Sequence, residues 1–103
     1  MKIIKNAIDV SDLDEFIYKA LPSQGCVEIQ NDAAGKEHTW HQHPNDETIL
    51  ILNGGLSFYA DNIEQKCYAG DAVLLPMGTR HGSIALETGA VYMISFQFLE
   101  FLS

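Results

Sequence analysis

The chain has 103 residues, of which 6 are Lys or Arg and 14 are Asp or Glu, so its formal net charge is −8. Such an acidic chain argues against binding to nucleic acid or to an anionic membrane surface, because both demand clustered Lys and Arg. Hydrophobic residues make up 47% and charged residues 19%, which is typical of a globular protein. A chain this short builds one core, so we expect a single domain over residues 1–103.

The sequence favours a cytoplasmic location. No stretch approaches the ~18 consecutive apolar residues of a membrane-spanning helix. The first nine residues also lack the apolar run of a signal peptide. Cys26 and Cys67 form no CxxC pair, and we expect both thiols to be free and reduced.

One helix is predicted over about residues 11–21. Ser11 is the expected N-cap, with Asp14 three residues later as part of a capping box. Apolar residues follow at helical spacing and form one face: Leu13, Phe16, Ile17, Ala20 and Leu21. Pro22 ends the helix, which we expect to pack over one edge or end of the protein.

After Pro22 the pattern changes to short strands. They are predicted at residues 26–30, 47–52, 56–60, 66–69, 72–75, 83–86 and 90–98. Asn53-Gly54-Gly55 predicts a tight hairpin, because Asn and Gly tolerate positive φ. Further turns are expected at Asp61-Asn62, Gly70-Asp71, Pro76-Met77-Gly78 and Thr88-Gly89. Turns about every ten residues are typical of an all-β sandwich or barrel, here over about residues 25–98.

The histidines are the main candidates for a chemical site. His41 and His43 are two residues apart in an expected strand, so both side chains lie on one face and suit binding to one ion. Pro44 indicates a turn or bulge, and periodicity therefore does not place Glu47. His38 is three residues before His41 and faces away in a regular strand, which predicts a surface residue or a residue supporting the site rather than a ligand.

The spacing of these residues resembles the two motifs of the cupin family. The matching positions are Gly35, His41, His43, Glu47 and Gly54 in the first motif and Gly70, Pro76, Gly78 and His81 in the second. The resemblance implies an all-β, double-stranded β-helix, or jelly-roll barrel. It also implies that His41, His43, Glu47 and His81 meet on one divalent metal in the barrel mouth. One position departs from the pattern: Ala85 stands where the family often has Asn, a residue that is not a metal ligand in the family.

Imidazole and carboxylate ligands suit Fe, Mn, Ni, Cu or Zn. Four protein ligands on an octahedral ion leave two positions for water, substrate or O₂. Ile49 and Ile51 share strand parity with Glu47, and Tyr92, Ile94 and Phe96 share one face of the last strand. Of these, Ile51, Tyr92, Ile94 and Phe96 are the main candidates for substrate contact. Val91 and Met93 are the alternative lining of that strand, and plain core packing is the alternative for every one of them.

Trp40, Arg80 and three tyrosines have competing interpretations. Trp40 alternates with the two histidines and is expected in the core or at a subunit interface. Arg80 is expected at the surface, with carboxylate binding as the alternative. The residues do not select among Tyr59, Tyr68 and Tyr92 as the source of a hydroxyl near the metal.

The leading functional hypothesis is a metal-dependent enzyme for a small molecule: a dioxygenase, isomerase, decarboxylase or lyase. The alternative is a non-catalytic module that binds or senses a small ligand, and a structural role is a third possibility. We also expect a homodimer, because a short barrel has exposed edge strands. The apolar segment 96–102 would dock on a second subunit or on the helix of its own chain.

Overall fold

Two long strands frame the protein in the computed structural model, which describes residues 1–101. They are β4 (Glu47–Ala60) and β7 (His81–Ser95). They pair antiparallel on both sides of a bend: one half of the ladder runs from Thr48↔Ser95 to Ile51↔Tyr92, and the other from Leu56↔Ala85 to Tyr59↔Gly82.

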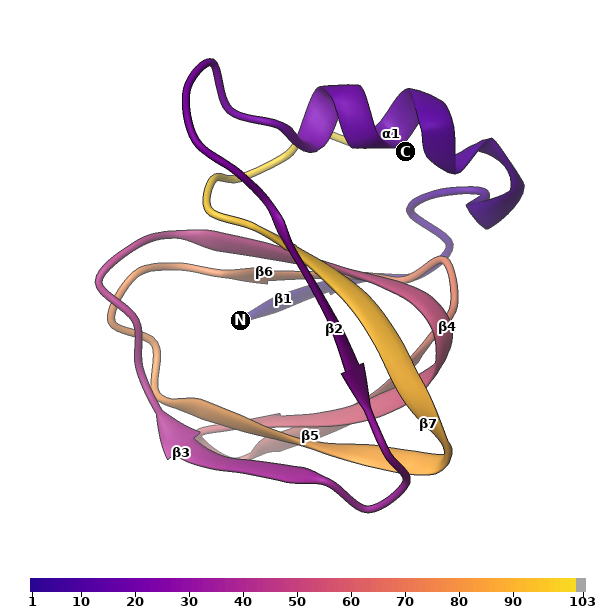
Figure 1. Cartoon of the computed structure of the whole chain (residues 1–103). Helices are drawn as coiled ribbons and strands as arrows, with labels where there is room; N and C mark the ends of the chain where they lie inside the picture. The colour runs from indigo at the N-terminus through magenta and orange to yellow at the C-terminus, as the bar shows by residue number, and fades with distance from the viewer. Residues whose placement is uncertain (102–103) are drawn as a thin grey trace.

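The shorter strands extend this pair into two layers. They are β1 (Lys2–Ile4), β2 (Glu28–Asp32), β3 (Glu37–His41), β5 (Ile63–Tyr68) and β6 (Ala72–Leu75). The sheet order is β1-β6-β4-β7-β2, with β3 also on β7 and β5 also on β4. Because β4 and β7 bend, β1, β6 and β2 lie in one layer, and β3 and β5 lie in the other (Figure 1). The predicted all-β jelly roll is confirmed.

The hairpin predicted at Asn53-Gly54-Gly55 is wrong, since these residues lie inside the uninterrupted strand β4. Gly54 has φ 70°, and Gly89, which precedes its β7 partner Ala90, has φ 74°. A Cβ on Gly54 would overlap the carbonyl oxygen of Gly89. The register shifts on both sides of Gly54. The glycines therefore bend the two strands together from one layer into the other, and the separate strands predicted on either side of Thr88-Gly89 are the single strand β7.

Other turn predictions are confirmed. Asp61 (φ 51°) and Asn62 connect β4 to β5. β6 occupies the predicted residues, Ala72–Leu75, and the Pro76–Gly78 turn leads out of it. These turns deliver β7 to the same end of the barrel at which β3 finishes (Figure 1).

The helix is shorter than predicted and is capped differently. A 3₁₀ turn, η1 (Val10–Asp12), precedes α1 (Leu13–Ala20). The side chain of Asp9 accepts hydrogen bonds from the backbone N–H of Ser11 (3.0 Å) and from its hydroxyl (2.7 Å). Because the chain begins to coil before Ser11, its N–H is one of the unpaired donors that need a cap, and Ser11 is not the cap. The predicted end before Pro22 is confirmed.

Apolar residues form two clusters, one on each side of the layer that contains β6 and the adjoining halves of β4 and β7. Between the layers lie Ile49, Ile51, Leu56, Phe58, Cys67, Val73, Leu75, Ala85, Ala90 and Tyr92. Between that layer and α1 lie Ile8, Ala20, Leu50, Ala72, Met93 and Leu99. The alternation of β4 explains the division, because Leu50 points the opposite way from its neighbours Ile49 and Ile51.

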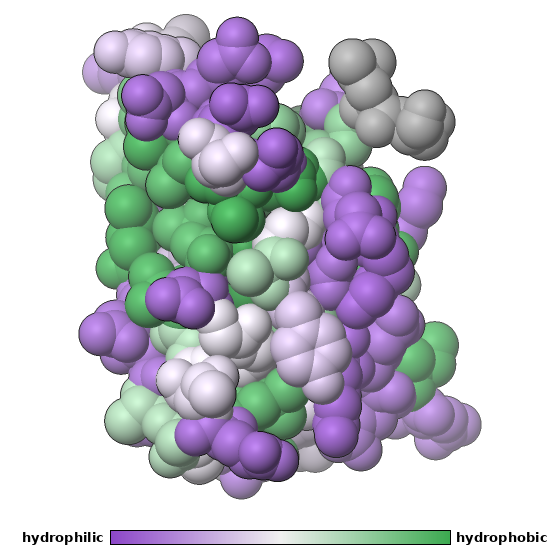
Figure 2. All heavy atoms as spheres, turned by 90° about the vertical axis from the view of Figure 1, so that its right-hand side faces the viewer, coloured by the Kyte–Doolittle hydropathy of each residue, from purple (hydrophilic) through white to green (hydrophobic). Residues whose placement is uncertain are grey.

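The helix covers the outer face of one layer (Figure 1), whereas the sequence predicted packing over an edge or end of the protein. The hydroxyl of Ser95 donates to the carbonyl of Ala20 (2.7 Å), which ties the end of α1 to β7. Phe16 stacks on Phe101 with ring centroids 5.7 Å apart. The tail thus docks on the helix of its own chain through Leu99 and Phe101, whereas Leu102, also part of the predicted apolar tail, lies outside the described residues. From the right-hand side of Figure 1, hydrophobic surface gathers below the helix, a hydrophilic face runs down the right side of the view, and the lower part is mixed (Figure 2).

Cys26 is exposed and Cys67 is buried, and both are free. Burial raises the pKa of the Cys67 thiol to about 11, so it stays protonated and unreactive at neutral pH. Within residues 1–101, the helices are too short and too polar to cross a membrane.

Candidate metal centre

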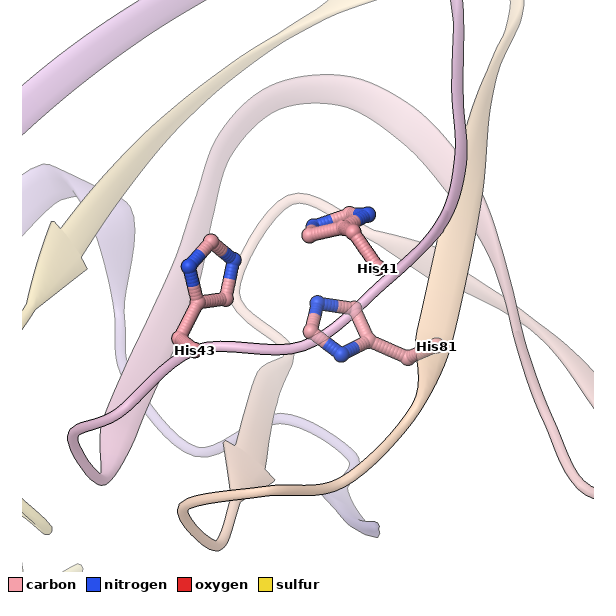
Figure 3. Close-up of side chains that lie close together, drawn as sticks. All are labelled: His41, His43 and His81. Carbon is pink, nitrogen blue, oxygen red and sulfur yellow. The ribbon is translucent and has the colours of Figure 1, made fainter.

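Three imidazoles meet at the open end of the barrel. His41 is the last residue of β3, His81 is the first residue of β7, and the two are partners in the β3–β7 ladder. His43 lies beyond β3, in the loop before β4, so the predicted strand around it ends two residues early. One ligand atom from each histidine lies within 4.8 Å of the other two, and the rings face a common space (Figure 3).

Backbone carbonyls orient two of these rings. Nδ1 of His41 is 2.5 Å from the carbonyl oxygen of Thr39, and Nδ1 of His81 is 2.9 Å from that of Thr79. A carbonyl oxygen only accepts, so Nδ1 carries the proton in both rings and Nε2 keeps its lone pair. A metal-binding histidine takes this form, with its second nitrogen donating to a carbonyl or carboxylate. The donor set therefore fits a transition-metal ion.

Glu47 lies at the edge of this group. It begins β4, is buried, and its Oε2 is 3.7 Å from Nε2 of His43. It is not among the three residues whose ligand atoms meet within 4.8 Å. Of the four side chains expected to converge, those of His41, His43 and His81 come together, and that of Glu47 lies beside His43.

Burial shapes the electrostatics of the centre. Burial raises the pKa of Glu47, against the opposing attraction of His43 and His41. Burial also lowers the pKa of His81, and its imidazole neighbours lower it further, although the bond to Thr79 acts in the opposite direction. His81 is therefore neutral at physiological pH and can offer a lone pair to a cation.

A cavity of about 260 Å³ opens beside the three histidines. Of the residues predicted to contact substrate, Tyr92, Ile94 and Phe96 line it. Ile51 does not line it, because Ile51 is fully buried in the cluster between the layers. The prediction for Ile51 is corrected to core packing, the alternative reading at that position.

The structure also bears on three remaining alternatives. Met93 belongs to the cluster beneath α1, so Tyr92 and Ile94 are the inward-facing set of β7. Trp40 is 45% exposed and its ring meets the edge of Tyr59 at 4.8 Å, which excludes the core. Arg80 is exposed, as expected.

The prediction that His38 faces away from the site is wrong. The β3–β7 register shifts between His38 and His41, and this irregularity resets the alternation of the strand. His38 consequently lines the same cavity as His41. Its Nε2 is 3.0 Å from Oδ2 of Asp32, a carboxylate buried at the end of β2.

Sequence reasoning missed the contribution of β2. Glu28 and Gln30 line the cavity, and Asp32 continues the same face of the strand. Ile29, between them, is 61% exposed. The available signal was this inverted alternation, in which polar residues face inward and the apolar residue faces outward. Ser83 of β7 also lines the cavity and carried no sequence signal.

The cupin-domain family model matches residues 28–96. The chain belongs to the cupin family. Among solved structures it resembles a cupin superfamily protein from Desulfitobacterium hafniense, with 19% identity, a TM-score of 0.63, and coverage of 76% of this chain and 73% of that one. It also resembles oxalate decarboxylase from Bacillus subtilis, with 22% identity, a TM-score of 0.64, and coverage of 74% and 22%.

The DMSP lyase DddQ from Ruegeria pomeroyi matches with 25% identity and a TM-score of 0.62 over 66% of this cupin. The match spans 35% of the lyase, so the cupin corresponds to about a third of its length. No curated protein matches the chain.

Proposed function

We propose that this cupin is a metal-dependent enzyme for a small molecule, with one divalent transition metal held by His41, His43, His81 and Glu47. The observation that carries the proposal is the convergence of three imidazoles beside a cavity, two of them fixed by backbone carbonyls in the metal-binding tautomer. Fe, Mn, Ni and Zn all accept this donor set.

The metal would act as a Lewis acid on a substrate oxygen or activate water or O₂. The chain supplies the surroundings. Tyr92, Ile94 and Phe96 form a wall that holds the carbon skeleton and excludes water, and neutral His81 keeps the ion bound at physiological pH. Among dioxygenase, isomerase and lyase chemistry, the similarity to a DMSP lyase favours lyase-type cleavage.

The test begins with elemental analysis of protein purified without chelators. We expect about one transition-metal ion per chain. O₂ uptake and lyase assays on a panel of small dicarbonyl compounds and sugar acids then follow on the loaded protein. A protein that binds metal but turns over none of the panel would favour the non-catalytic binding module. A protein that takes up no transition metal would refute the metal centre.

We also propose that the chain is one cupin domain that works in the cytoplasm as a homodimer. Both cysteines are free, as in a reducing compartment. Phe98 and Ile29 leave apolar surface exposed after the tail has docked on α1, which supports a second subunit.

A further inference from the structure

A buried carboxylate, that of Asp32, lies behind the part of the cavity wall that His38 and Tyr92 form. Asp32 is 7% exposed. Its Oδ2 receives the hydroxyl of Tyr92 at 2.8 Å and lies 3.0 Å from Nε2 of His38. Tyr92 and His38 line the cavity, whereas Asp32 is not among the lining residues within the described chain. Asp32 therefore acts on the cavity through two side chains in its wall.

The arrangement fixes where the protons lie. An ionised carboxylate only accepts hydrogen bonds, so the single proton of Tyr92 and the Nε2 proton of His38 both go to Asp32. Burial, together with the bond to Asp32, raises the pKa of the Tyr92 hydroxyl, which keeps that proton in place. The Tyr92 oxygen then has only lone pairs left to offer the cavity, and the His38 ring directs its Nε2–H toward Asp32.

The charges in the cavity are one-sided. Glu28 and Glu47 line the cavity. Among the residues that the structure describes, no Lys or Arg lines it. A bound divalent cation would be balanced by these two carboxylates. A ligand with two negative charges would then lack a counter-charge in a partly desolvated space, which is unfavourable.

We propose that Asp32 is a positioning residue that makes this wall a hydrogen-bond acceptor, so that the cavity selects a small, uncharged ligand rich in hydroxyl groups, of the polyol or sugar class, over dianions. This specificity rests on the proposed function for the metal end of the site. Ile94 and Phe96 provide apolar surface for the C–H faces of such a ligand. The cavity of about 260 Å³ suits a metabolite-sized molecule, since pockets for larger ligands occupy roughly 300–1,000 Å³.

The first experiment measures the tautomer of His38 by two-bond ¹H–¹⁵N correlation spectra, without added metal or ligand. We expect the Nε2-protonated form in the wild-type protein and a loss of that preference in Asp32→Asn. A wild-type ring protonated at Nδ1, or the same tautomer in both proteins, would overturn the role of Asp32. Because no metal is involved, this result is independent of the proposed function.

The second experiment measures binding to zinc-loaded protein by saturation-transfer NMR. The probes are xylitol and D-xylose on one side and malonate and inorganic phosphate on the other. We expect the neutral probes to bind the wild-type protein and to bind at least tenfold more weakly to Asp32→Asn and Tyr92→Phe. Glu87→Gln, which neutralises an exposed carboxylate outside the cavity, is the matched control and should bind as the wild type does.

Zinc content, measured for each variant, distinguishes the two ways to fail. Wild-type protein that holds no zinc would refute the metal centre and leave Asp32 to be judged by the tautomer. Zinc-loaded wild type that prefers malonate or phosphate, or that binds neither xylitol nor xylose, would overturn the proposed ligand class.

Discussion

Thr39 and Thr79 serve the metal centre through their backbone carbonyls. Each carbonyl accepts the Nδ1 proton of a histidine two residues further on, so the same carbonyl-to-imidazole spacing is used at the end of β3 and at the start of β7. The two rings therefore need no side-chain partner to present Nε2 to a cation. Because the backbone carbonyls orient the rings, replacing a Thr side chain should leave metal binding unchanged. Replacing a histidine should abolish it.

Removing one of these imidazoles should empty the centre. We expect His41→Ala and His81→Ala each to lower the metal content from about one ion per chain to near zero, because each removes one ligand of a small set. Elemental analysis after dialysis gives the measurement. Gln42→Ala is the control, since Gln42 is exposed between two of the histidines. Unchanged metal content in both histidine variants would disprove the assignment.

Metal binding should also fall with pH. Coordination requires a neutral imidazole, and an unperturbed imidazole gains a proton near pH 6.5. Burial lowers the pKa of His81, so this ligand stays neutral to a lower pH than a free imidazole does. We expect occupancy to be constant at pH 7–8 and to decline below about pH 6.5. Equal occupancy at pH 8 and pH 5, measured after equilibrium dialysis, would contradict histidine ligation.

The buried carboxylate of Asp71, away from the metal centre, stabilises the fold. Asp71 is buried and holds the N-terminal segment to the β5–β6 turn: it accepts from the ammonium of Lys5 (2.5 Å) and from the N–H groups of Asn6 (2.9 Å) and Tyr68 (2.8 Å). Burial by itself would raise the pKa of Asp71, but these hydrogen bonds outweigh it and the pKa is lowered.

A lowered pKa in the folded state means that the ionised carboxylate stabilises the fold above the unfolded-state value, near 4, and that this contribution disappears as the pH falls through the folded-state value. We expect Asp71→Asn to reduce the free energy of unfolding by about 2 kcal/mol at pH 7. The difference from the wild type should shrink below about pH 4. Urea denaturation at pH 7 and pH 3 tests both statements, and an equal difference at the two pH values would contradict them.

At this scale, the sequence predicted the residues whose role depends on spacing. His41 and His43 share a face by strand alternation, and the resemblance to the two cupin motifs implies that His81 joins them. His38 did not follow, because one irregularity in β3 reverses the direction of a side chain while leaving the sequence pattern unchanged. Asp32 did not follow either, since its partners lie on β3 and β7 and only the folded sheet brings them together.

Among the elements, β4 and β7 show how a local signal can have two outcomes. Asn-Gly favours positive φ, and both a hairpin turn and a bend within a strand use it. The pairing of β4 with β7 on both sides of Gly54 decides for the bend, and that pairing joins residues 23 to 47 positions apart. The sequence therefore predicted the location of the irregularity and not the direction of the chain after it.

The bend at Gly54 allows two contributions to the loss of stability on Gly→Ala substitution to be separated: backbone strain at positive φ and steric overlap of the new Cβ with backbone. Gly54 and Gly35 both have positive φ (70° and 79°), but only at Gly54 would a Cβ meet backbone, whereas nothing lies within 4 Å of one at Gly35. We expect Gly35→Ala to cost about 1–2 kcal/mol of stability from backbone strain alone. Gly54→Ala should cost at least about 3 kcal/mol, because the β4–β7 ladder must also separate. Thermal or urea unfolding of the pair gives the comparison, and equal losses would show that the close approach of Gly89 does not matter.

For the molecule as a whole, the question is how a chain of 103 residues covers its apolar surface. The helix α1 and the tail cover one layer through contacts such as Phe16 with Phe101. This accounts for part of the tail that the sequence marked as too apolar to remain exposed. Phe98 is nevertheless 45% exposed, and Ile29 is 61% exposed on β2, a strand that ends the sheet and pairs only with β7 within the described residues.

An unpaired edge with exposed apolar side chains is the kind of surface that a second copy of the chain covers. We expect the wild-type protein to have about twice the monomer mass of 11.4 kDa in light scattering at micromolar concentration. Ile29→Lys should shift it toward the monomer, because the ammonium would be buried without a partner at that edge. Ile63→Lys is the matched control: Ile63 is 56% exposed at the start of β5, away from β2, and its substitution should leave the dimer intact. A wild-type mass of one chain would reject the dimer, and dissociation by both lysine variants alike would reject β2 as the edge that forms it.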